Sequence, residues 1–378
     1  MQVLAWGTYD LSKPRVRILL RALRGVADVE LRECHQDVWG GMADKSQLHG
    51  LGKKMRIVLR WLFAYPRLIW CLFRQPRPDV IFVGYLGQFD VLLLWPFARL
   101  RGIPIVWDAF ISLYNTVVED RRIVGRRHPL ALLLYGTEWL ATRAADLVLL
   151  DTRAHANYFV ETFGIHADKT AAVFVGVEPE VFSHDAPRDK PATPYSVLFY
   201  GQFTPLHGIE VIVQAARILK NTSVHWILIG KGQEERKITT LLEEQPLPQV
   251  NWIPWVEYED LIAWIAHADL CLGIFDSGGK ASRVIPNKVF QILEAGKPLI
   301  TRDSPAIREL ISPHEEGVIL VPPDDPAALA TAVLRMRDAA GPANGLHYSI
   351  RQKFTIPEIG KALVQILSRL QRPAATLN

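Results

Sequence analysis

The chain has 378 residues, enough for two domains of ordinary size. Hydrophobic residues make up 49% of the sequence and charged residues 22%, which favours large cores and argues against global disorder. The net charge of +4 does not indicate a nucleic-acid-binding protein.

Short apolar runs alternate with helical stretches through the first half of the chain. We expect strands at Gln2–Trp6, Val29–Glu33, Val80–Val83, Ile105–Trp107, Leu147–Leu150 and Ala172–Val175. The expected helices are Arg15–Arg24, Lys53–Arg74, Gln88–Arg101, Pro129–Ala144 and Thr152–Phe163. Apolar strands that alternate with helices predict a parallel sheet covered on both faces.

A polar, proline-rich segment at 183–195 is the expected linker, and the alternation restarts after it. Further strands are expected at Ser196–Tyr200, His225–Ile229, Val250–Trp252, Leu270–Gly273, Pro298–Thr301 and Val318–Val321. Helices are expected at Gly208–Lys220, Gly232–Glu244, Tyr258–His267, Asn287–Ala295, Ala306–Ile311, Asp325–Ala339 and Ile356–Leu370. The sequence thus predicts an α/β protein with two Rossmann-like doubly wound domains, at 1–182 and 196–355, facing across a cleft.

The cysteines and the N-terminus bear on the cellular compartment. Cys34, Cys71 and Cys271 show neither a paired spacing nor a histidine at metal-ligand spacing, so we expect reduced, buried thiols. Charged residues follow the first strand too early for a signal peptide, and no apolar run reaches the length of a membrane span. We expect a cytoplasmic protein, soluble or peripheral on the inner face of the membrane.

The segment 285–302 predicts a loop, a short helix and a buried strand. Pro286 favours an extended residue before it, and Asn287 is the expected N-cap. Cations gather at this helix start, namely Lys280, Arg283 and Lys288. Helix-end amides and cations together predict a diphosphate site, the alternative being a solvated basic loop before an ordinary helix.

Two glycine-containing loops follow predicted strands of the second half. Gly201 and Gly208 flank one loop, and Gly230 lies in the other, which also carries Lys231. Glycine lets a backbone approach a ligand closely, although it is common in ordinary turns as well. If both loops and residues 280–302 lie at the same rim of a sheet, they form one binding site.

In their order along the chain, these motifs resemble family 4 glycosyltransferases of the GT-B fold. The resemblance covers most of the second domain, in Tyr200-Gly-Gln…His-Gly208, Ile229-Gly-Lys-Gly232, residues 256–272, Ile285-Pro-Asn-Lys288…Gly-Lys-Pro298, Ser304–Leu310 and Gly317–Pro326. The first domain resembles the family more loosely, at Gly7–Asp10, Asp108 and 145–152. The segment 356–378 resembles the helix that crosses back to the first domain in that fold.

The resemblance implies transfer of a sugar from a nucleotide-diphosphate sugar to a glycan or lipid-linked acceptor, with retention of configuration. The first domain would hold the acceptor and the second the donor, and cations would stabilise the leaving diphosphate. We assign Asp108, Lys288 and Arg283 to catalysis. The expected donor-binding residues are Gly201, Gln202, His207, Gly208, Gly230, Lys231, Lys280, Asn287, Gln291 and Glu309. No Asp-x-Asp motif occurs, so we expect no metal and no cofactor.

Several positions depart from the family pattern. Gln202 and His207 stand where the family commonly has arginine and lysine. Arg283 and Gln291 replace its pair of glutamates, and Glu294 lies about one helical turn later. Gln291 could still hydrogen-bond a ribose hydroxyl. Two alternatives therefore stay open: a nucleotide-sugar epimerase on the same fold, and a glycosyltransferase-like binding protein without turnover.

Four single residues each have a structural alternative. Asp108 could orient an acceptor hydroxyl or take its proton, or it could cap a turn. Capping is the expected role of Asp10. Glu309 could contact the donor or serve the fold, and His207 could contact phosphate or be solvated in a turn.

The segment 53–77 contains seven basic residues and no acidic one. Lys53, Arg60, Arg67 and Arg74 recur every seven residues, with aromatic residues between them. This pattern predicts contact with an anionic membrane surface, with Pro66 kinking or dividing the helix. The alternatives are a helix packed on the first sheet with solvated arginines, and, less favoured by the modest net charge, nucleic-acid binding.

Overall fold

A computed structural model gives the structure of the chain and describes residues 1–38, 51–178, 194–312, 314–339 and 346–371, with backbone alone for 51–58. The chain forms two compact units. The first comprises Met1–Val118, Ile123–Val175 and Ile356–Asn378, and the second comprises Glu119–Arg122 and Gly176–Thr355. Apart from residues 194 and 195, the predicted linker at 183–195 lies outside the described residues.

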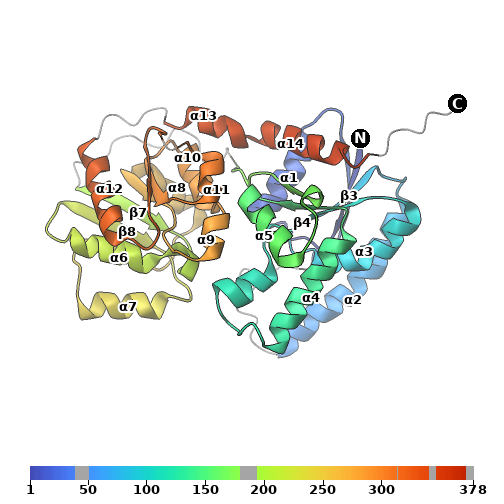
Figure 1. Cartoon of the computed structure of the whole chain (residues 1–378), viewed down its shortest axis with the longest axis horizontal. Helices are drawn as coiled ribbons and strands as arrows, with labels where there is room; N and C mark the ends of the chain where they lie inside the picture. Colours follow the sequence, from blue (N-terminus) through green and yellow to red (C-terminus); the bar gives the residue numbers. More distant parts are fainter. Residues whose placement is uncertain (39–50, 179–193, 313, 340–345, 372–378) are drawn as a thin grey trace. The chain divides into compact units, whose positions relative to one another are not determined.

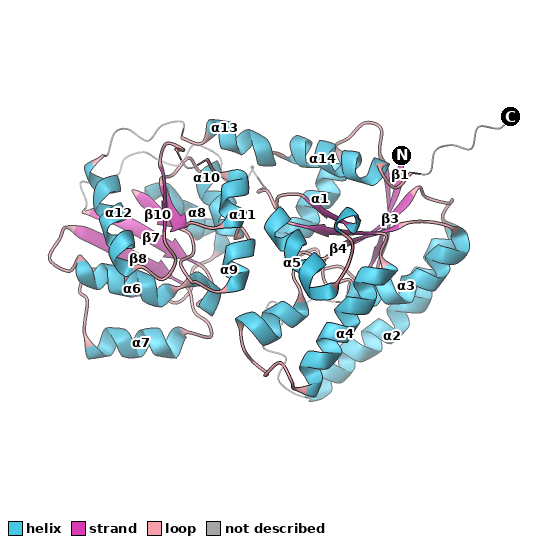
Figure 2. Cartoon of the chain, in the orientation of Figure 1, coloured by secondary structure: helices cyan, strands magenta, loops and turns pink. Residues whose placement is uncertain are grey.

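The first unit is built on a six-stranded parallel sheet with the order β2-β1-β3-β4-β5-β6. Its strands are β1 (Gln2–Gly7), β2 (Glu30–His35), β3 (Val80–Val83), β4 (Ile105–Asp108), β5 (Leu147–Leu150) and β6 (Thr170–Ala172). Its helices are α1 (Pro14–Arg24), α2 (Leu51–Arg74), α3 (Gln88–Arg101), α4 (Pro129–Ala144), α5 (Arg153–Phe163) and α14 (Ile356–Ser368). Helices and strands are distinguished by colour in Figure 2.

Alternate residues of the first sheet pack into separate cores on its two faces, as the two-residue period of a strand requires. Leu4 and Trp6 of β1 belong to the core that includes side chains from α2, α3, α4 and α5. Val3 and Ala5 belong to the opposite core, with α1 and α14. The amphipathic face of the last helix is therefore buried within the first unit.

The second unit has its own six-stranded parallel sheet, with the order β12-β11-β10-β7-β8-β9. Its strands are β7 (Tyr195–Tyr200), β8 (Val224–Ile229), β9 (Val250–Ile253), β10 (Leu270–Leu272), β11 (Leu299–Arg302) and β12 (Val318–Val321). Its helices are α6 (Ile209–Ile218), α7 (Glu235–Glu244), α8 (Tyr258–His267), α9 (Gly279–Arg283), α10 (Asn287–Glu294), α11 (Pro305–Leu310), α12 (Pro326–Asp338) and α13 (Tyr348–Arg351). Figure 1 shows these elements along the chain.

Both sheets confirm the predicted class, α/β with two doubly wound parallel sheets. Each sheet has one point where the strand order reverses, between β1 and β3 in the first unit and between β7 and β10 in the second. In open parallel sheets, ligands bind beyond the carboxyl ends of the strands at such a point. The second unit's reversal point is where the predicted glycine loop after β7 begins.

Each predicted strand and helix lies within a few residues of an observed one, but details differ. Pro286, not Asn287, is the N-cap of α10, and Asn287 is its first residue. Pro66 lies inside α2, which continues to Arg74. The short helices α9 and α13 were not predicted. None of the described helices is long and apolar enough to cross a membrane.

The prediction of three reduced thiols was wrong. Cys34 of β2 and Cys71 of α2 form a disulfide, with their Cα atoms 6.0 Å apart. Thirty-seven residues separate them in sequence, and only the packing of α2 on the sheet brings them together. Cys271 is a buried thiol as expected, and burial raises its pKa to about 12.

Candidate functional site

The two glycine loops of the second unit lie directly against each other. Gly201 donates its amide hydrogen to Ile229 O at 2.9 Å, and Phe203 donates to Lys231 O at 3.0 Å. Gly201 and Gly230 have φ angles of 139° and 146°, a region that side chains disfavour. A Cβ on Gly230 would lie 1.9 Å from the carbonyl oxygen of Gly201. Glycine is therefore what allows the loops after β7 and β8 to meet.

The loop after β10 joins the same region from the other side of β7. Gly208, with a φ of 62°, begins α6, and a Cβ there would lie 2.7 Å from the amide nitrogen of Asp276. Phe275 donates its amide hydrogen to His207 O at 3.2 Å. The loops that follow β7, β8 and β10 thus come together at the point where the strand order reverses.

Lys288, near the start of α10, lies beside the loop that follows β7. Its side chain is buried, and its Nζ is 3.1 Å from the position that a Cβ on Gly201 would take. Nζ lies 3.7 Å from the centre of the Phe199 ring, and no described residue forms a hydrogen bond with it. Burial lowers the pKa of Lys288 well below its ordinary value. A buried ammonium without a bonded partner is costly, so burial favours the neutral amine, and an anion supplied from outside would favour its protonated form.

His207 lies beside Lys288, in a neutral state. Its Nδ1 contacts the carbonyl oxygen of Gln202, so the neutral ring carries its hydrogen on Nδ1 and leaves Nε2 as an acceptor. Burial, followed by the nearby Lys288, lowers the pKa of His207 well below its ordinary value. For His207 to donate to a phosphate through Nε2, as the sequence suggested, the ring must first gain a proton.

The polar face of α10 is held by neighbouring side chains. Gln291 accepts a hydrogen bond from the Tyr200 hydroxyl at 3.1 Å and donates to the Tyr258 hydroxyl at 3.3 Å. Glu294 forms an ion pair with Arg351 at 2.8 Å, which ties α10 to α13. Glu294 therefore has a structural contact, and Gln291 is the polar side chain on this face that is oriented by two tyrosines.

The other two predicted cations have acidic neighbours within the second unit. Lys280 Nζ lies 2.9 Å from a carboxylate oxygen of Asp120, and Arg283 lies 3.8 Å from Glu119. The sequence suggested three cations shared by one diphosphate. The structure instead separates Lys288, which has no bonded partner among the described residues, from these two paired cations.

The remaining predicted donor residues lie around the loops. Lys231 is exposed, with its Nζ 5.9 Å from the centre of the Trp255 ring, and Gln202 is exposed as well. Asn287 carries one of the first amides of α10, where no side chain caps the helix. Glu309 is half-buried on α11, which packs on α9.

Asp108, proposed for acceptor chemistry, is fully buried at the end of β4 in the first unit. Arg15 donates to its carboxylate from two nitrogens, at 2.8 to 3.1 Å. Burial raises the pKa of Asp108, and the Arg15 guanidinium opposes that shift. This geometry favours the structural alternative for Asp108. Asp10 accepts a hydrogen bond from the amide of Ser12 at 3.0 Å, which agrees with its expected turn role.

Asp90 and Glu138 are among the buried carboxylates of the first unit that were not singled out from the sequence. Asp90 accepts hydrogen bonds from the Thr8 amide at 2.6 Å and from the Tyr65 hydroxyl at 2.9 Å. Glu138 accepts from the Ser112 hydroxyl at 2.6 Å, and burial raises its pKa to about 7. Each lies in a helix with apolar neighbours, which is the signal that could have marked it as a buried group.

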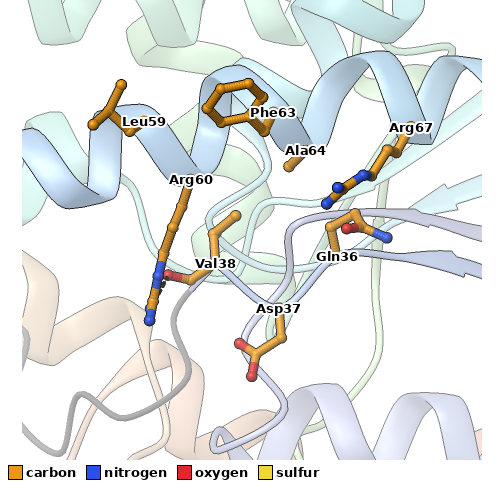
Figure 3. A pocket seen from close by; sticks show the side chains of 8 residues that line it. All are labelled: Gln36, Asp37, Val38, Leu59, Arg60, Phe63, Ala64 and Arg67. Atoms are coloured by element: carbon orange, nitrogen blue, oxygen red, sulfur yellow. Dashed lines mark hydrogen bonds between the residues drawn. The ribbon is translucent and has the colours of Figure 1, made fainter.

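A cavity of about 440 Å³ lies in the first unit between α2 and the residues that follow β2 (Figure 3). Figure 3 shows Arg60 beside Val38 and Arg67 beside Gln36, with Leu59 and Phe63 above them. Arg60 donates to the carbonyl oxygen of Val38 at 3.4 Å. The cavity is lined by charged side chains of both signs, namely Asp37, Arg60 and Arg67, and by apolar ones, near the carboxyl end of β2.

Comparison with known proteins agrees with these features. The family described as Glycosyl transferases group 1 matches residues 194–338. The amylovoran biosynthesis glycosyltransferase AmsK of Erwinia amylovora is 26% identical over 267 residues, which are 70% of this chain and 62% of AmsK. The chain thus spans about three-fifths of the length of the first curated relatives it matches.

Solved structures share the fold. Sucrose-phosphate synthase from Thermosynechococcus elongatus superposes with a TM-score of 0.70 at 17% identity, covering 98% of both chains. Anabaena HepE, in complex with UDP and glucose, gives a TM-score of 0.67 at 16% identity, covering 98% of this chain and all of HepE. The two parallel sheets and these superpositions show the GT-B fold, and residues 194–338 of the second unit match the family described as Glycosyl transferases group 1.

Proposed function

We propose that the chain transfers a sugar from a nucleotide-diphosphate sugar to a glycan or lipid-linked acceptor. The observation that carries this proposal is the buried Lys288 amino group, which lies beside Gly201 at the reversal point of the second sheet. The group 1 family match over the same unit supports it, as does the HepE complex with UDP and glucose. AmsK, whose name places it in amylovoran biosynthesis, supports a glycan as the acceptor class.

The chemical role of this site follows from charge. As the bond between sugar and diphosphate breaks, negative charge grows on the leaving diphosphate. Lys288 and the uncapped first amides of α10 could stabilise that charge without water between them. Because burial lowers the pKa of Lys288, binding of an anion would also draw a proton to the site. Arg283 is proposed to assist as a second cation of the same region.

Two finer parts of the proposal concern the reaction. The resemblance to family 4 supports transfer with retention of the anomeric configuration. Metal independence is supported by the sequence, which has no Asp-x-Asp motif to hold a nucleotide-bound divalent ion. The donor is a substrate, and no further cofactor is included in the proposal.

The acceptor side of the proposal rests on the first unit. We propose that it receives the acceptor and that residues 53–77 contact an anionic membrane surface, on the cytoplasmic face. The described part of α2 supports this, because Leu62, Phe63 and Trp70 are exposed beside Arg67 and Arg74. This placement would bring the protein close to a lipid-linked acceptor.

A thermal-shift screen with UDP, GDP, ADP and their sugars tests donor binding. We expect one nucleotide series to raise the melting temperature, since a ligand that binds only the native state stabilises it. Lys288→Ala should abolish that shift, whereas Lys231→Ala, which removes an exposed cation of the neighbouring loop, should reduce it only slightly.

Turnover assays separate the open alternatives. Donor hydrolysis or transfer that is lost in both Lys288→Ala and Arg283→Ala supports the enzyme. Conversion of the donor sugar to its epimer without any acceptor would indicate an epimerase. Nucleotide binding that persists without turnover under any acceptor would indicate a binding protein, in line with the replacement of the usual glutamates by Arg283 and Gln291.

A further inference from the structure

One short segment of the second unit, Glu119–Arg122, is separated in sequence from the rest of that unit. Its first two residues, Glu119 and Asp120, end the π-helix η2 (Asn115–Asp120). Arg122 has a φ of 49°, a left-handed conformation that is costly for a residue other than glycine. π-Helices and residues in such conformations are both uncommon and are found mostly at ligand sites and in segments that change conformation.

The two acidic side chains of this segment pair with the two cations of α9. Lys280 Nζ lies 2.9 Å from a carboxylate oxygen of Asp120, and both side chains are mostly buried, at 16% and 7% exposure. The Arg283 guanidinium lies 3.8 Å from Glu119, and each of these two side chains is 22% exposed. Carboxylates of the chain itself thus occupy positions around α9 that an anionic ligand could also take.

These ion pairs lie next to the proposed donor site. Helix α9 packs on the 3-10 helix η5 (Pro205–His207). Atoms of His207 and Lys288 lie within 3.4 Å of the position that a Cβ on Gly201 would take. Burial, Lys288 and Lys280 each lower the pKa of His207. Lys280 is therefore close enough to the glycine loop after β7 to change the charge state of its histidine.

The loops after β8 and β10 also lie near this segment. Gln233, in the loop after β8, donates a hydrogen bond to the carbonyl oxygen of Arg121 at 3.2 Å. In the loop after β10, burial raises the pKa of Asp276, and the charges of Asp324 and Asp120 add to the shift. Negative charge is thus already concentrated where the loops of the donor site meet the segment.

This charge distribution opposes the binding of a further anion. If Asp120 and Glu119 stayed in place, a diphosphate at α9 would adjoin two carboxylates, and like charges repel strongly in a partly buried site. Burial lowers the pKa of Lys280 and Asp120 opposes that shift, so the Lys280 ammonium depends on an anion beside it. Exchange of one anion for the other satisfies both conditions.

We propose that Asp120 and Glu119 are internal counterions of the donor-free chain, and that the diphosphate of the donor displaces them from Lys280 and Arg283. The proposal deepens the proposed function, on which it rests, by naming residues that compete with the donor for its cations. The segment 119–122 moves away from α9 when the donor binds, and the strained backbone of Arg122 is where its conformation changes.

Calorimetric titration of the full chain with UDP and with inorganic pyrophosphate tests this exchange. The double variant Glu119→Gln with Asp120→Asn removes both competing charges and should bind pyrophosphate roughly tenfold more tightly than the wild type. Its affinity should also fall more steeply with ionic strength, because the cations then meet the ligand without internal counterions. If the two carboxylates only hold α9 in place, their loss should weaken binding instead.

Matched variants control for net charge and for folding. Glu243→Gln with Glu244→Gln, in the last turn of α7, removes the same charge from exposed positions and should bind like the wild type. Asp120→Glu keeps the carboxylate and should not show the increase in affinity. If circular dichroism shows that the double variant is unfolded, Glu119→Gln alone, which breaks the longer and more exposed pair, should give a smaller increase.

Hydrogen exchange gives an independent measurement of the displacement. Pyrophosphate or UDP should increase exchange in the wild-type peptide that covers residues 115–123, because the segment leaves its partners. The peptide that covers the glycine loop at 201–208 should gain protection at the same time. Protection of both peptides would contradict the exchange, since it would mean that the carboxylates remain in place.

The outcomes separate this proposal from the proposed function. Unchanged or weaker binding by the double variant, together with binding that Lys288→Ala abolishes, would overturn the exchange and leave the donor site standing. Tighter binding by the double variant, together with binding that Lys288→Ala leaves intact, would support the exchange and contradict the role of Lys288. If neither protein binds pyrophosphate, UDP, GDP or ADP, both proposals are wrong.

Discussion

The two units share a doubly wound parallel architecture but differ in whether their buried charged side chains have partners. At the strand ends of the first unit, Asp108 is paired with Arg15, and Asp90 accepts hydrogen bonds from Thr8 and Tyr65. At the strand ends of the second unit, Lys288 is buried with no bonded partner among the described residues. The sheets are alike, but the buried acidic groups named in the first unit have partners within the fold, whereas the buried amino group of the second unit has none, and the proposed donor site rests on that group.

The two units also differ in the apolar side chains that they expose. The first unit exposes many large apolar side chains on α2, α3 and α4, whereas in the described part of the second unit the exposed ones are Ile218, Trp255, Tyr258 and Tyr348. Exposed apolar side chains are thus more numerous in the described part of the first unit, and the glycine loops that meet beside Lys288 belong to the second.

The largest expected effect is on the buried ion pair of the first unit. Asp108→Asn leaves the Arg15 guanidinium buried without an opposite charge, so we expect a loss of about 3–5 kcal/mol in the free energy of unfolding. Urea denaturation measures it. Asp338→Asn, which breaks an exposed pair with Arg337, is the control and should change stability by less than about 1 kcal/mol. Equal effects in the two variants would contradict a structural role for Asp108.

A comparable effect is expected where the glycine loops meet in the second unit. Gly230→Ala places a Cβ 1.9 Å from a backbone oxygen, so the loops must separate. We expect a loss of about 2–4 kcal/mol in stability and of nucleotide binding together. Gly136→Ala in α4, where a Cβ meets nothing within 4 Å, should instead stabilise the chain by about 0.5–1 kcal/mol. Unchanged nucleotide binding in Gly230→Ala would show that loop contact is not required.

The free energy of unfolding of the first unit should depend on pH through the titration of Glu138. Its pKa is about 7 in the folded chain against an ordinary 4.5, so the folded state holds a proton that the unfolded chain releases. The resulting stability is complete below pH 4.5 and is lost as the pH rises through 7. We expect the loss to be roughly 3 kcal/mol at most.

Melting temperatures measured across this pH range test the assignment. Glu138→Gln carries no titrating group and should flatten the curve. An unchanged slope in this variant would mean that Glu138 is already ionised in the folded chain at low pH, and that its hydrogen bonds outweigh its burial.

A smaller effect, but the one that discriminates best between the units, is expected at Lys288. Lys288→Met keeps an apolar side chain and removes the buried amino group, which has no bonded partner, so the free energy of unfolding should rise by about 1–2 kcal/mol while nucleotide affinity falls. The opposite outcome, a loss of stability with retained binding, would place Lys288 among structural groups like Arg15.

The same variant has a predicted pH signature. The pKa of Lys288 is lowered on folding, so the unfolded chain holds more protons, and this group makes stability increase as the pH rises toward its ordinary pKa of 10.5. Lys288→Met should remove that increase. Melting curves of both proteins at alkaline pH measure it.

Local sequence patterns determined the strands, the helices and the order of the loops. The apolar pattern predicted the position of every strand within a few residues. This is possible because a strand's buried residues and its ends are set by residues that are close in sequence. The glycines at 201, 208 and 230 could also be predicted as loop residues, since a positive φ angle is a requirement of the local backbone. Lys288 was predicted as an anion-binding cation from its place at a helix start.

Contacts between distant residues were decided by the tertiary structure alone. The disulfide of Cys34 and Cys71, the pairing of Asp108 with Arg15, and the acidic neighbours of Lys280 and Arg283 join residues at least 37 positions apart. The sequence provides the groups, but their electrostatic state depends on which partner the fold brings within bonding distance.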